Sequence, residues 1–311
     1  APAARRSTLA ADAAVLAIAV VWGASYPVTK GALAHAPVLV LIVYRFAVSA
    51  GLMGLAARRE LASAPRGDIL RGVVLGAILA AIFTVEIAGL ARTSATNAAL
   101  IISLCTLLTP FLDHGLSRRL PPPLVIAGAA VACLGVGLLV GGLTAWTLGD
   151  GLILLAAALR AVMVVSTQRL MVSRSLSSRA LTAVQAATVA GLALVALLLT
   201  QGGGALAVRA GAGFWGSVAF LSLFCTVAAF YVQNAAVRLT SPTRVGFLMG
   251  TEPLFGFALA HVLLSEPVTG TASLGAALIV AGTFVGLLAD RRAGGDASPP
   301  ASRRAARRGP A

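Results

Sequence analysis

The fold is decided by the stretch Thr240–Thr269, T-S-P-T-R-V-G-F-L-M-G-T-E-P-L-F-G-F-A-L-A-H-V-L-L-S-E-P-V-T, which a second apolar run follows. Glu252 lies midway along an apolar segment that is long enough to cross a bilayer, and Pro253 follows it directly. An acidic side chain in hydrocarbon is costly, so such residues usually face a bundle interior or a cavity and serve a function. We therefore predict a membrane protein in which Glu252 belongs to the functional site.

The same stretch is the second copy of an earlier one. A shift of 147 positions brings the two copies into register without a gap, and it aligns Phe83 with Phe230, Thr93 with Thr240, His114 with His261, Gly128 with Gly275, and Gly135 with Gly282. Glu252 departs from this repeat because its counterpart is Cys105, whereas Glu86 is matched by Gln233. We interpret the chain as an internal duplication.

The composition indicates a protein that has lipid as its solvent. The 311 residues are 59% hydrophobic and 11% charged, and the mean hydropathy is +0.94. A water-soluble domain cannot bury so much apolar surface. The net charge of +14 does not indicate nucleic-acid binding, because the basic residues lie in loops and tails between apolar runs. The three cysteines lie inside apolar runs without metal-ligand or disulfide spacing, so we expect them to pack between helices.

Windowed hydropathy predicts ten membrane spans. They cover roughly 13–33, 37–57, 69–90, 95–113, 122–141, 148–169, 179–199, 214–236, 243–264 and 270–289. The first run ends in small residues that resemble a signal cleavage site, so a cleaved signal peptide is the alternative there. The length of the run and the presence of Trp22, Pro27 and Lys30 favour a retained helix.

The distribution of basic residues predicts the orientation and the domain organisation. With ten spans, nineteen basic residues fall on the side of the termini and three, Lys30, Arg92 and Arg209, on the other. This asymmetry places both termini in the cytoplasm of a multi-pass inner-membrane protein. Each repeat then has five spans, and the two repeats insert in opposite directions. The predicted organisation is a cytoplasmic N-terminal segment (1–12), two five-helix repeats (13–141 and 148–289), and a basic, disordered cytoplasmic tail (290–311).

Several motifs resemble those of the EamA-type drug/metabolite transporters. They are V-V-W-G-A-S-Y-P-V-T-K (Val20–Lys30), Tyr44-Arg45-Phe46, T-S-x-x-N-A from Thr93, and E-P-x₉-L-x-x-E from Glu252 to Glu266. The resemblance covers about residues 12–290. It implies a ten-helix bundle of two inverted halves with a central cavity, which exports or exchanges small metabolites. The chain departs from the family pattern at Arg160, where an aromatic residue is usual.

Charged residues inside the predicted spans are the first candidates for a solute site. Arg160 and Glu252 lie near the middle of spans 6 and 9. They either line the cavity and bind a charged solute or a proton, or form a structural ion pair between these spans, and the two roles are compatible. Arg45 and Glu86 lie nearer the outer face, where they either pair with each other or line an outer vestibule.

Aromatic and amide side chains complete the candidate site. An aromatic wall for an apolar solute would comprise Trp22, Tyr26, Tyr44, Phe83, Phe230 and Tyr231, although helix packing and interfacial anchoring are alternative roles for them. The amides that can donate and accept hydrogen bonds to a solute are Asn97, Gln233 and Asn234. His114 and His261 are either satisfied helix-end residues or a proton relay.

We predict a secondary transporter that exports or exchanges amino acids or related polar or amphipathic solutes across the cytoplasmic membrane by alternating access. The alternatives are efflux of multiple drugs or cationic compounds, and a membrane scaffold without transport. An enzyme is not expected, because neither H-E-x-x-H nor G-x-S-x-G occurs and no catalytic or metal-ligand set is present. We expect no cofactor, no metal and no nucleic-acid partner; proton coupling and the oligomeric state stay open.

Overall fold

The computed structural model describes residues 2–116, 120–139, 146–171, 176–229, 232, 249 and 251–294. Over these residues the chain is helical, without any strand. It contains ten apolar helical segments, which confirms the prediction of an all-α polytopic membrane protein. The five that are long and apolar enough to cross a membrane are Asp12–Leu33, Val38–Ser63, Arg66–Leu90, Leu148–Met171 and Ser178–Thr200.

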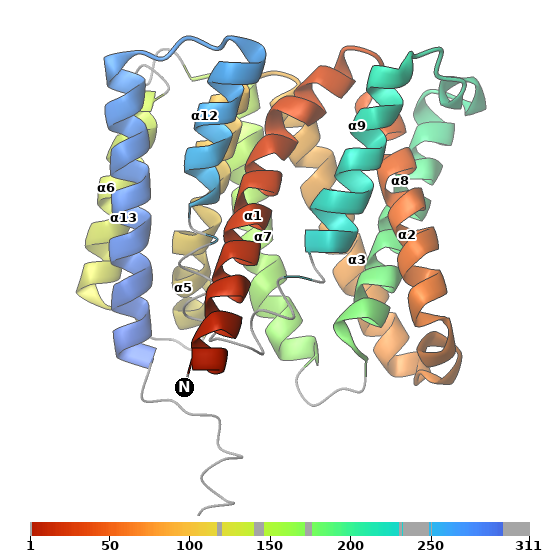
Figure 1. The fold of residues 1–311 in the computed structure, drawn as a ribbon, viewed down its shortest axis with the longest axis horizontal. Coiled ribbons are helices and arrows are strands. Elements are labelled where there is room, and N and C mark those ends of the chain that lie inside the picture. The colour runs from red at the N-terminus through yellow and green to blue at the C-terminus, as the bar shows by residue number, and fades with distance from the viewer. Residues whose placement is uncertain are drawn as a thin grey trace, which may run out of the picture.

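The described elements are a series of helices along the chain. They are α1 (Pro2–Leu33), α2 (Val38–Ser63), α3 (Arg66–Leu90), α4 (Ala95–Ile102), α5 (Cys105–Leu116), α6 (Pro123–Leu139), α7 (Leu148–Met171), α8 (Ser178–Thr200), η2 (Gly203–Leu206), α9 (Ala212–Ser222), the π-helical turn η3 (Leu223–Ala228), α12 (Glu252–Leu264) and α13 (Gly270–Gly294). The helices run roughly along one direction, and the start of α1 and the end of α13 lie at the same end of the bundle (Figure 1).

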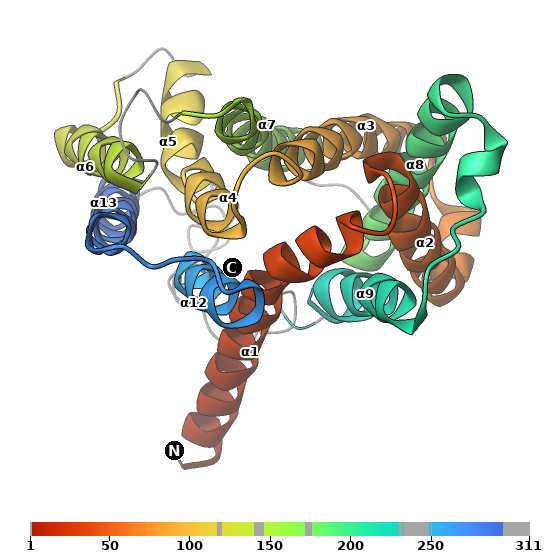
Figure 2. The ribbon, with the colours of Figure 1, turned by 90° about the horizontal axis from the view of Figure 1, so that it is seen from above.

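The helices gather into two groups, and each group contains helices of both repeats. From above, α4, α5, α6, α12 and α13 lie on one side, α2, α3, α8 and α9 lie on the other, and α1 runs between them (Figure 2). Each group has its own apolar core: Leu100 and Ile279 are buried in the first, and Phe46 and Leu221 in the second. The units that pack together in space are therefore not the two sequence repeats.

The contact between α6 and α13 has the geometry of an inverted repeat. A Cβ atom added at Gly128 would lie 2.6 Å from the carbonyl oxygen of Gly282, and one added at Gly135 would lie 2.6 Å from that of Gly275. These four glycines are two repeat-related pairs, so the contact is self-complementary, as a two-fold relation requires. The lower-numbered glycine of α6 meets the higher-numbered one of α13, so the two equivalent helices are antiparallel. Gly128 and Gly275, which the repeat register aligns, therefore both sit at this close helix contact.

The fourth predicted span, 95–113, is helical in the structure, but a turn interrupts it. Helix α4 ends at Ile102 and α5 begins at Cys105. The Ser103 hydroxyl bonds to the carbonyl oxygen of Leu100 at 2.7 Å, and the Leu104 amide bonds to that of Ile101, one residue closer than in an α-helix. Local side-chain bonding of this kind competes with the helical ladder.

The second repeat places a helix start at the matching position. Helix α12 begins at Glu252, the counterpart of Cys105, and the residue before each helix, Thr251 or Leu104, lies in a turn. Pro253 lies in the first turn of α12, where the missing amide hydrogen leaves no helical bond unmade.

Helix α1 is an integral part of the bundle and contacts both groups. Its Gly23 lies against the backbone of α12, where an added Cβ atom would be 2.7 Å from the amide nitrogen of Gly256. The indole nitrogen of Trp22 donates to the carbonyl oxygen of Cys225 in the π-helical turn η3, at 2.8 Å. Both the Gly23–Gly256 contact and the Trp22 hydrogen bond join α1 to the second repeat. These contacts favour a retained first helix over a cleaved signal peptide.

Replacing Gly128 by Leu is expected to destabilise the protein by about 1–3 kcal/mol or more, because backbone atoms of α13 occupy the space that the side chain needs. Gly137→Leu in the same helix is the matched control, since nothing lies within 4 Å of a Cβ atom there. The melting temperatures of the two variants in detergent measure their stabilities. Equal melting temperatures for the two variants would contradict the close α6–α13 contact.

Candidate functional site

An ion pair between Glu86 and Arg160 joins the two repeats inside the bundle. Nη2 of Arg160 lies 2.8 Å from Oε2 and 3.0 Å from Oε1 of Glu86, and its Nε lies 3.2 Å from Oε2. Glu86 is buried in α3, and Arg160 projects from α7. The fork-like geometry satisfies both carboxylate oxygens, so each charge offsets much of the desolvation of the other.

This arrangement corrects two predictions about the ion pairs. Arg160 does not form its ion pair with Glu252, so spans 6 and 9 are not joined in this way. Glu86 pairs with Arg160, and not with Arg45. The physical reason is the helix arrangement: α3 packs along α7, which brings a carboxylate of the first repeat to the guanidinium of the second.

Glu252 is stabilised by other means at the first turn of α12. The hydroxyl of Tyr26 in α1 donates to Oε1 of Glu252 at 3.2 Å. A carboxylate at a helix N-terminus also interacts favourably with the helix dipole. Glu252 interacts electrostatically with Arg160 and Glu86 as well, which places it beside the ion pair. Among the described residues, no hydrogen bond is made to its second oxygen.

Arg45 in α2 is a buried cation without an ionic partner among the residues that the structure describes. Its side chain is 93% buried, since only 7% of the residue is exposed, and its Nε has no hydrogen-bond acceptor. The guanidinium carbon lies 4.7 Å from the ring centre of Phe83 and 5.4 Å from that of Phe46. A cation can be attracted by an aromatic face in this way, but the ring does not replace a hydrogen-bond acceptor.

The four charges form one electrostatically connected cluster, which we call the interior charge cluster: Arg45, Glu86, Arg160 and Glu252. Glu86 and Arg160 both interact electrostatically with Arg45, and both interact with Glu252. Among the described residues the cluster contains two cations and two anions and is formally neutral.

The aromatic residues separate into different environments. Tyr26 lies at the interior charge cluster, and Phe83 stacks with Arg45 and packs edge-on against Phe46, 4.6 Å away. Tyr44 instead donates to the carbonyl oxygen of Leu206 at 2.6 Å and packs against Trp215. Tyr44 thus packs against other parts of the protein at the end of the bundle. This is the alternative role, helix packing, that we considered for the aromatic residues.

The predicted amides lie apart from the cluster or outside the described part of the chain. Nδ2 of Asn97 donates to Oδ1 of Asp150 at 3.0 Å. Asp150 precedes Arg160 by ten residues in α7, so this contact lies roughly 15 Å along the helix axis from the ion pair. The other expected site residues Tyr231, Gln233 and Asn234, and also Phe230, lie outside the described residues.

Two carboxylates that the sequence analysis did not select join the repeats at the same end of the bundle. Asp150 is fully buried and accepts hydrogen bonds from the hydroxyls of Thr93 and Thr147. Glu266 accepts the amide hydrogens of Ala95 at 2.7 Å and Thr96 at 3.0 Å, and so caps the start of α4. The spacing T-x-x-D from Thr147 resembles a helix capping box and is the signal that could have identified Asp150.

A third carboxylate forms an equivalent contact at the opposite end. Glu60 at the end of α2 accepts the Ser177 amide hydrogen at 2.5 Å and the Ser177 hydroxyl at 2.6 Å, just before α8 begins. Carboxylates therefore bridge the two repeats at each end of the bundle. No group of three or more metal-ligating His, Cys, Asp or Glu side chains occurs within the described part of the chain.

Ten apolar helical segments are what a multi-pass membrane protein requires. The match to a known family agrees: residues 9–141 and 147–288 each match the model of the EamA-like transporter family. The chain therefore belongs to the EamA-like transporter family, which is part of the drug/metabolite transporter superfamily.

The fold is also similar to that of solved structures. One of them, described as "Crystal structure of protein", superposes with a TM-score of 0.62 at 20% sequence identity, and the alignment covers 93% of this chain and 99% of that one. At this level of identity the likeness concerns the fold alone. No curated protein sequence matches the chain.

Proposed function

We propose that the protein transports small zwitterionic solutes, such as amino acids and related metabolites, across the cytoplasmic membrane. The observation that supports this is the unequal pairing within the interior charge cluster. Glu86 and Arg160 satisfy each other, whereas Arg45 and Glu252 have no ionic partner among the described residues. One free cation and one free anion in the same cluster suit a solute that carries both charges.

Each end of a zwitterion has a chemically matched partner. The guanidinium of Arg45 presents parallel N–H donors that fit a carboxylate. Glu252 accepts an ammonium group through the oxygen that Tyr26 leaves unused. The solute supplies the acceptor that the Nε of Arg45 lacks, so binding removes the cost of a buried unsatisfied donor.

Efflux of cationic compounds is the second candidate function, and the cluster is less suited to it. A cation would gain Glu252 and the ring of Tyr26, but it would approach two guanidinium groups. Like charges in a site of low dielectric repel strongly. A scaffold without transport would leave Arg45 buried without an ionic partner among the described residues.

We further propose that alternating access moves the two helix groups against each other, with the end that holds both termini in the cytoplasm. The carboxylate contacts at the two ends of the bundle would open in alternation, those of Asp150 and Glu266 at one end and that of Glu60 at the other. The groups are taken as the moving units, rather than the sequence repeats, because each packed group contains helices of both repeats.

Arg45→Gln is expected to raise the apparent KM for a transported amino acid by about tenfold or more, because a charge-assisted hydrogen bond contributes roughly 1.5–3 kcal/mol. Uptake by proteoliposomes measures it, with the methyl ester of the same amino acid as the comparison solute. The ester lacks the carboxylate, so its KM should stay within about twofold of wild type. Arg92→Gln, which removes an exposed arginine, is the control. An equal loss for acid and ester would contradict the assignment of Arg45 to the carboxylate.

A further inference from the structure

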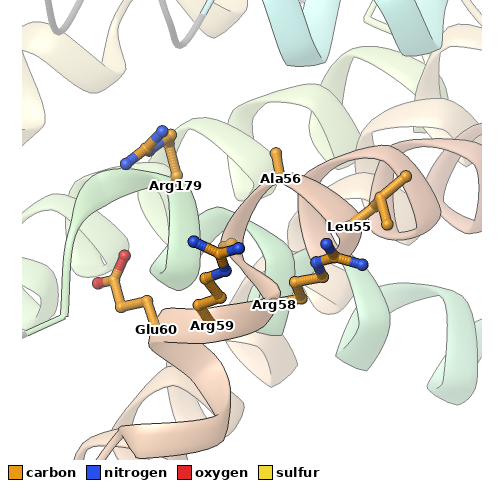
Figure 3. A pocket seen from close by; sticks show the side chains of 7 residues that line it. Leu55, Ala56, Arg58, Arg59, Glu60 and Arg179 are labelled. Carbon is orange, nitrogen blue, oxygen red and sulfur yellow. The ribbon is translucent and has the colours of Figure 1, made fainter.

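A hollow lined by three arginines lies where α2 ends and α8 begins. It has a volume of about 360 Å³ and is lined by Leu55, Ala56, Ala57, Arg58, Arg59, Glu60 and Arg179. Figure 3 shows the charged side chains of both helices around it. A volume of this size falls within the range of about 300–1,000 Å³ that is typical of small-molecule sites.

The charges around the hollow are not balanced within the described part of the protein. The only carboxylate that lines it, Glu60, already accepts two hydrogen bonds from Ser177. Arg58, Arg59 and Arg179 form no ion pair closer than 4 Å with any described residue, so the lining keeps a net positive charge. Guanidinium groups that line one hollow are suited to phosphate oxygens, which a guanidinium can bind bidentately.

An apolar stripe leads from the hollow along the outer face of α2. Leu55 at the rim is 65% exposed, and Leu52 and Val48 are also exposed at helical spacing on the same face. This stripe belongs to a segment long and apolar enough to cross a membrane. A free phosphate ion would make no use of such a surface, whereas the acyl chain of a phospholipid would lie along it.

We propose that this hollow is a binding site for the phosphate headgroup of an anionic phospholipid, with an acyl chain along Val48, Leu52 and Leu55. Arg58 and Arg179 come from α2 and α8, which belong to different repeats, so a headgroup held by both bridges the repeats at this end. The lipid thereby reinforces the neighbouring contact between Glu60 and Ser177.

Native mass spectrometry of the full chain in detergent, titrated with phosphatidylglycerol, tests the site. The double variant R58Q/R179Q should bind phosphatidylglycerol about thirtyfold more weakly than wild type, on the basis of about fivefold for each arginine removed. The control R66Q/R292Q removes two exposed arginines outside the hollow and should change the affinity by less than about twofold. Ala56→Trp fills the hollow without changing the charge, so it should weaken phosphatidylglycerol binding by a similar factor. This variant tests the site even if R58Q/R179Q does not fold.

Two results would overturn the proposal. Equal weakening in R58Q/R179Q and R66Q/R292Q would mean that total charge attracts the lipid and the hollow does not. Displacement of phosphatidylglycerol by an equal concentration of inorganic phosphate would identify a site for the free anion. Phosphatidylcholine, which has the same phosphate but no net charge, should bind at least about tenfold more weakly than phosphatidylglycerol.

Discussion

Glu252→Gln is expected to reduce transport by at least about thirtyfold while the protein remains inserted and monodisperse. Removing one partner of a buried, hydrogen-bonded charge pair costs about 2–5 kcal/mol, and the solute ammonium would lose its partner at this position. Gln keeps the size of the side chain and an oxygen that can accept the Tyr26 hydroxyl. The variant therefore separates the charge of Glu252 from its structural contact.

Proteoliposome uptake measures the loss, and Tyr26→Phe is the matched control. That variant removes the hydrogen bond to Glu252 but leaves the carboxylate, so uptake should fall by no more than about fivefold. Wild-type uptake by Glu252→Gln over a range of pH would mean that the carboxylate is structural. The aromatic surface around Trp22 would then be the better candidate site.

Arg160→Gln or Glu86→Gln alone is expected to destabilise the protein by about 3–5 kcal/mol, because either change leaves a buried charge unpaired. The double variant E86Q/R160Q should recover most of this stability, since it removes both charges. It should not recover transport, because the link between α3 and α7 in the interior charge cluster is lost. Denaturant unfolding in detergent of the wild type, the two single variants and the double variant gives the coupling energy between Glu86 and Arg160.

The same cycle with Glu252 tests the corrected pairing. The coupling between Arg160 and Glu252 should be clearly smaller than that between Arg160 and Glu86, because only the second pair is in hydrogen-bond contact. A larger coupling to Glu252 would support the ion pair between spans 6 and 9, which was one of the two alternatives from the sequence. Additive effects of Glu86 and Arg160 would contradict the ion pair altogether.

The span pattern and the duplication could be predicted from the sequence because both are properties of the chain itself. Hydropathy depends on composition along the chain, and the repeat register identified Gly128 and Gly275 as helix contacts before their partners were known. The helix break at Ser103 escaped prediction because the surrounding residues are as apolar as a continuous span. A local hydrogen bond from one serine has no effect on hydropathy.

The partners inside the site could not be predicted from depth alone. Glu86 and Glu252 are both carboxylates near the level of Arg160, and only the packing of the helices decides which one meets it. The position of Asn97 could not be predicted for the same reason. Its residue type suggested a solute ligand, but in the structure its side chain donates a hydrogen bond to Asp150 at the end of the bundle. Charge and residue type identified the cluster, whereas its pairing is a property of the three-dimensional arrangement.

Uptake of an amino acid by proteoliposomes that contain the wild-type protein tests the central claim most directly, when compared with two analogues of the same side chain. One analogue is the methyl ester, which lacks the carboxylate, and the other is the deaminated acid, which lacks the ammonium group. We predict saturable uptake of the zwitterion and at least about tenfold lower kcat/KM for each analogue, because each leaves Arg45 or Glu252 unpaired. Faster uptake of the ester than of the zwitterion would contradict the claim and support transport of cations.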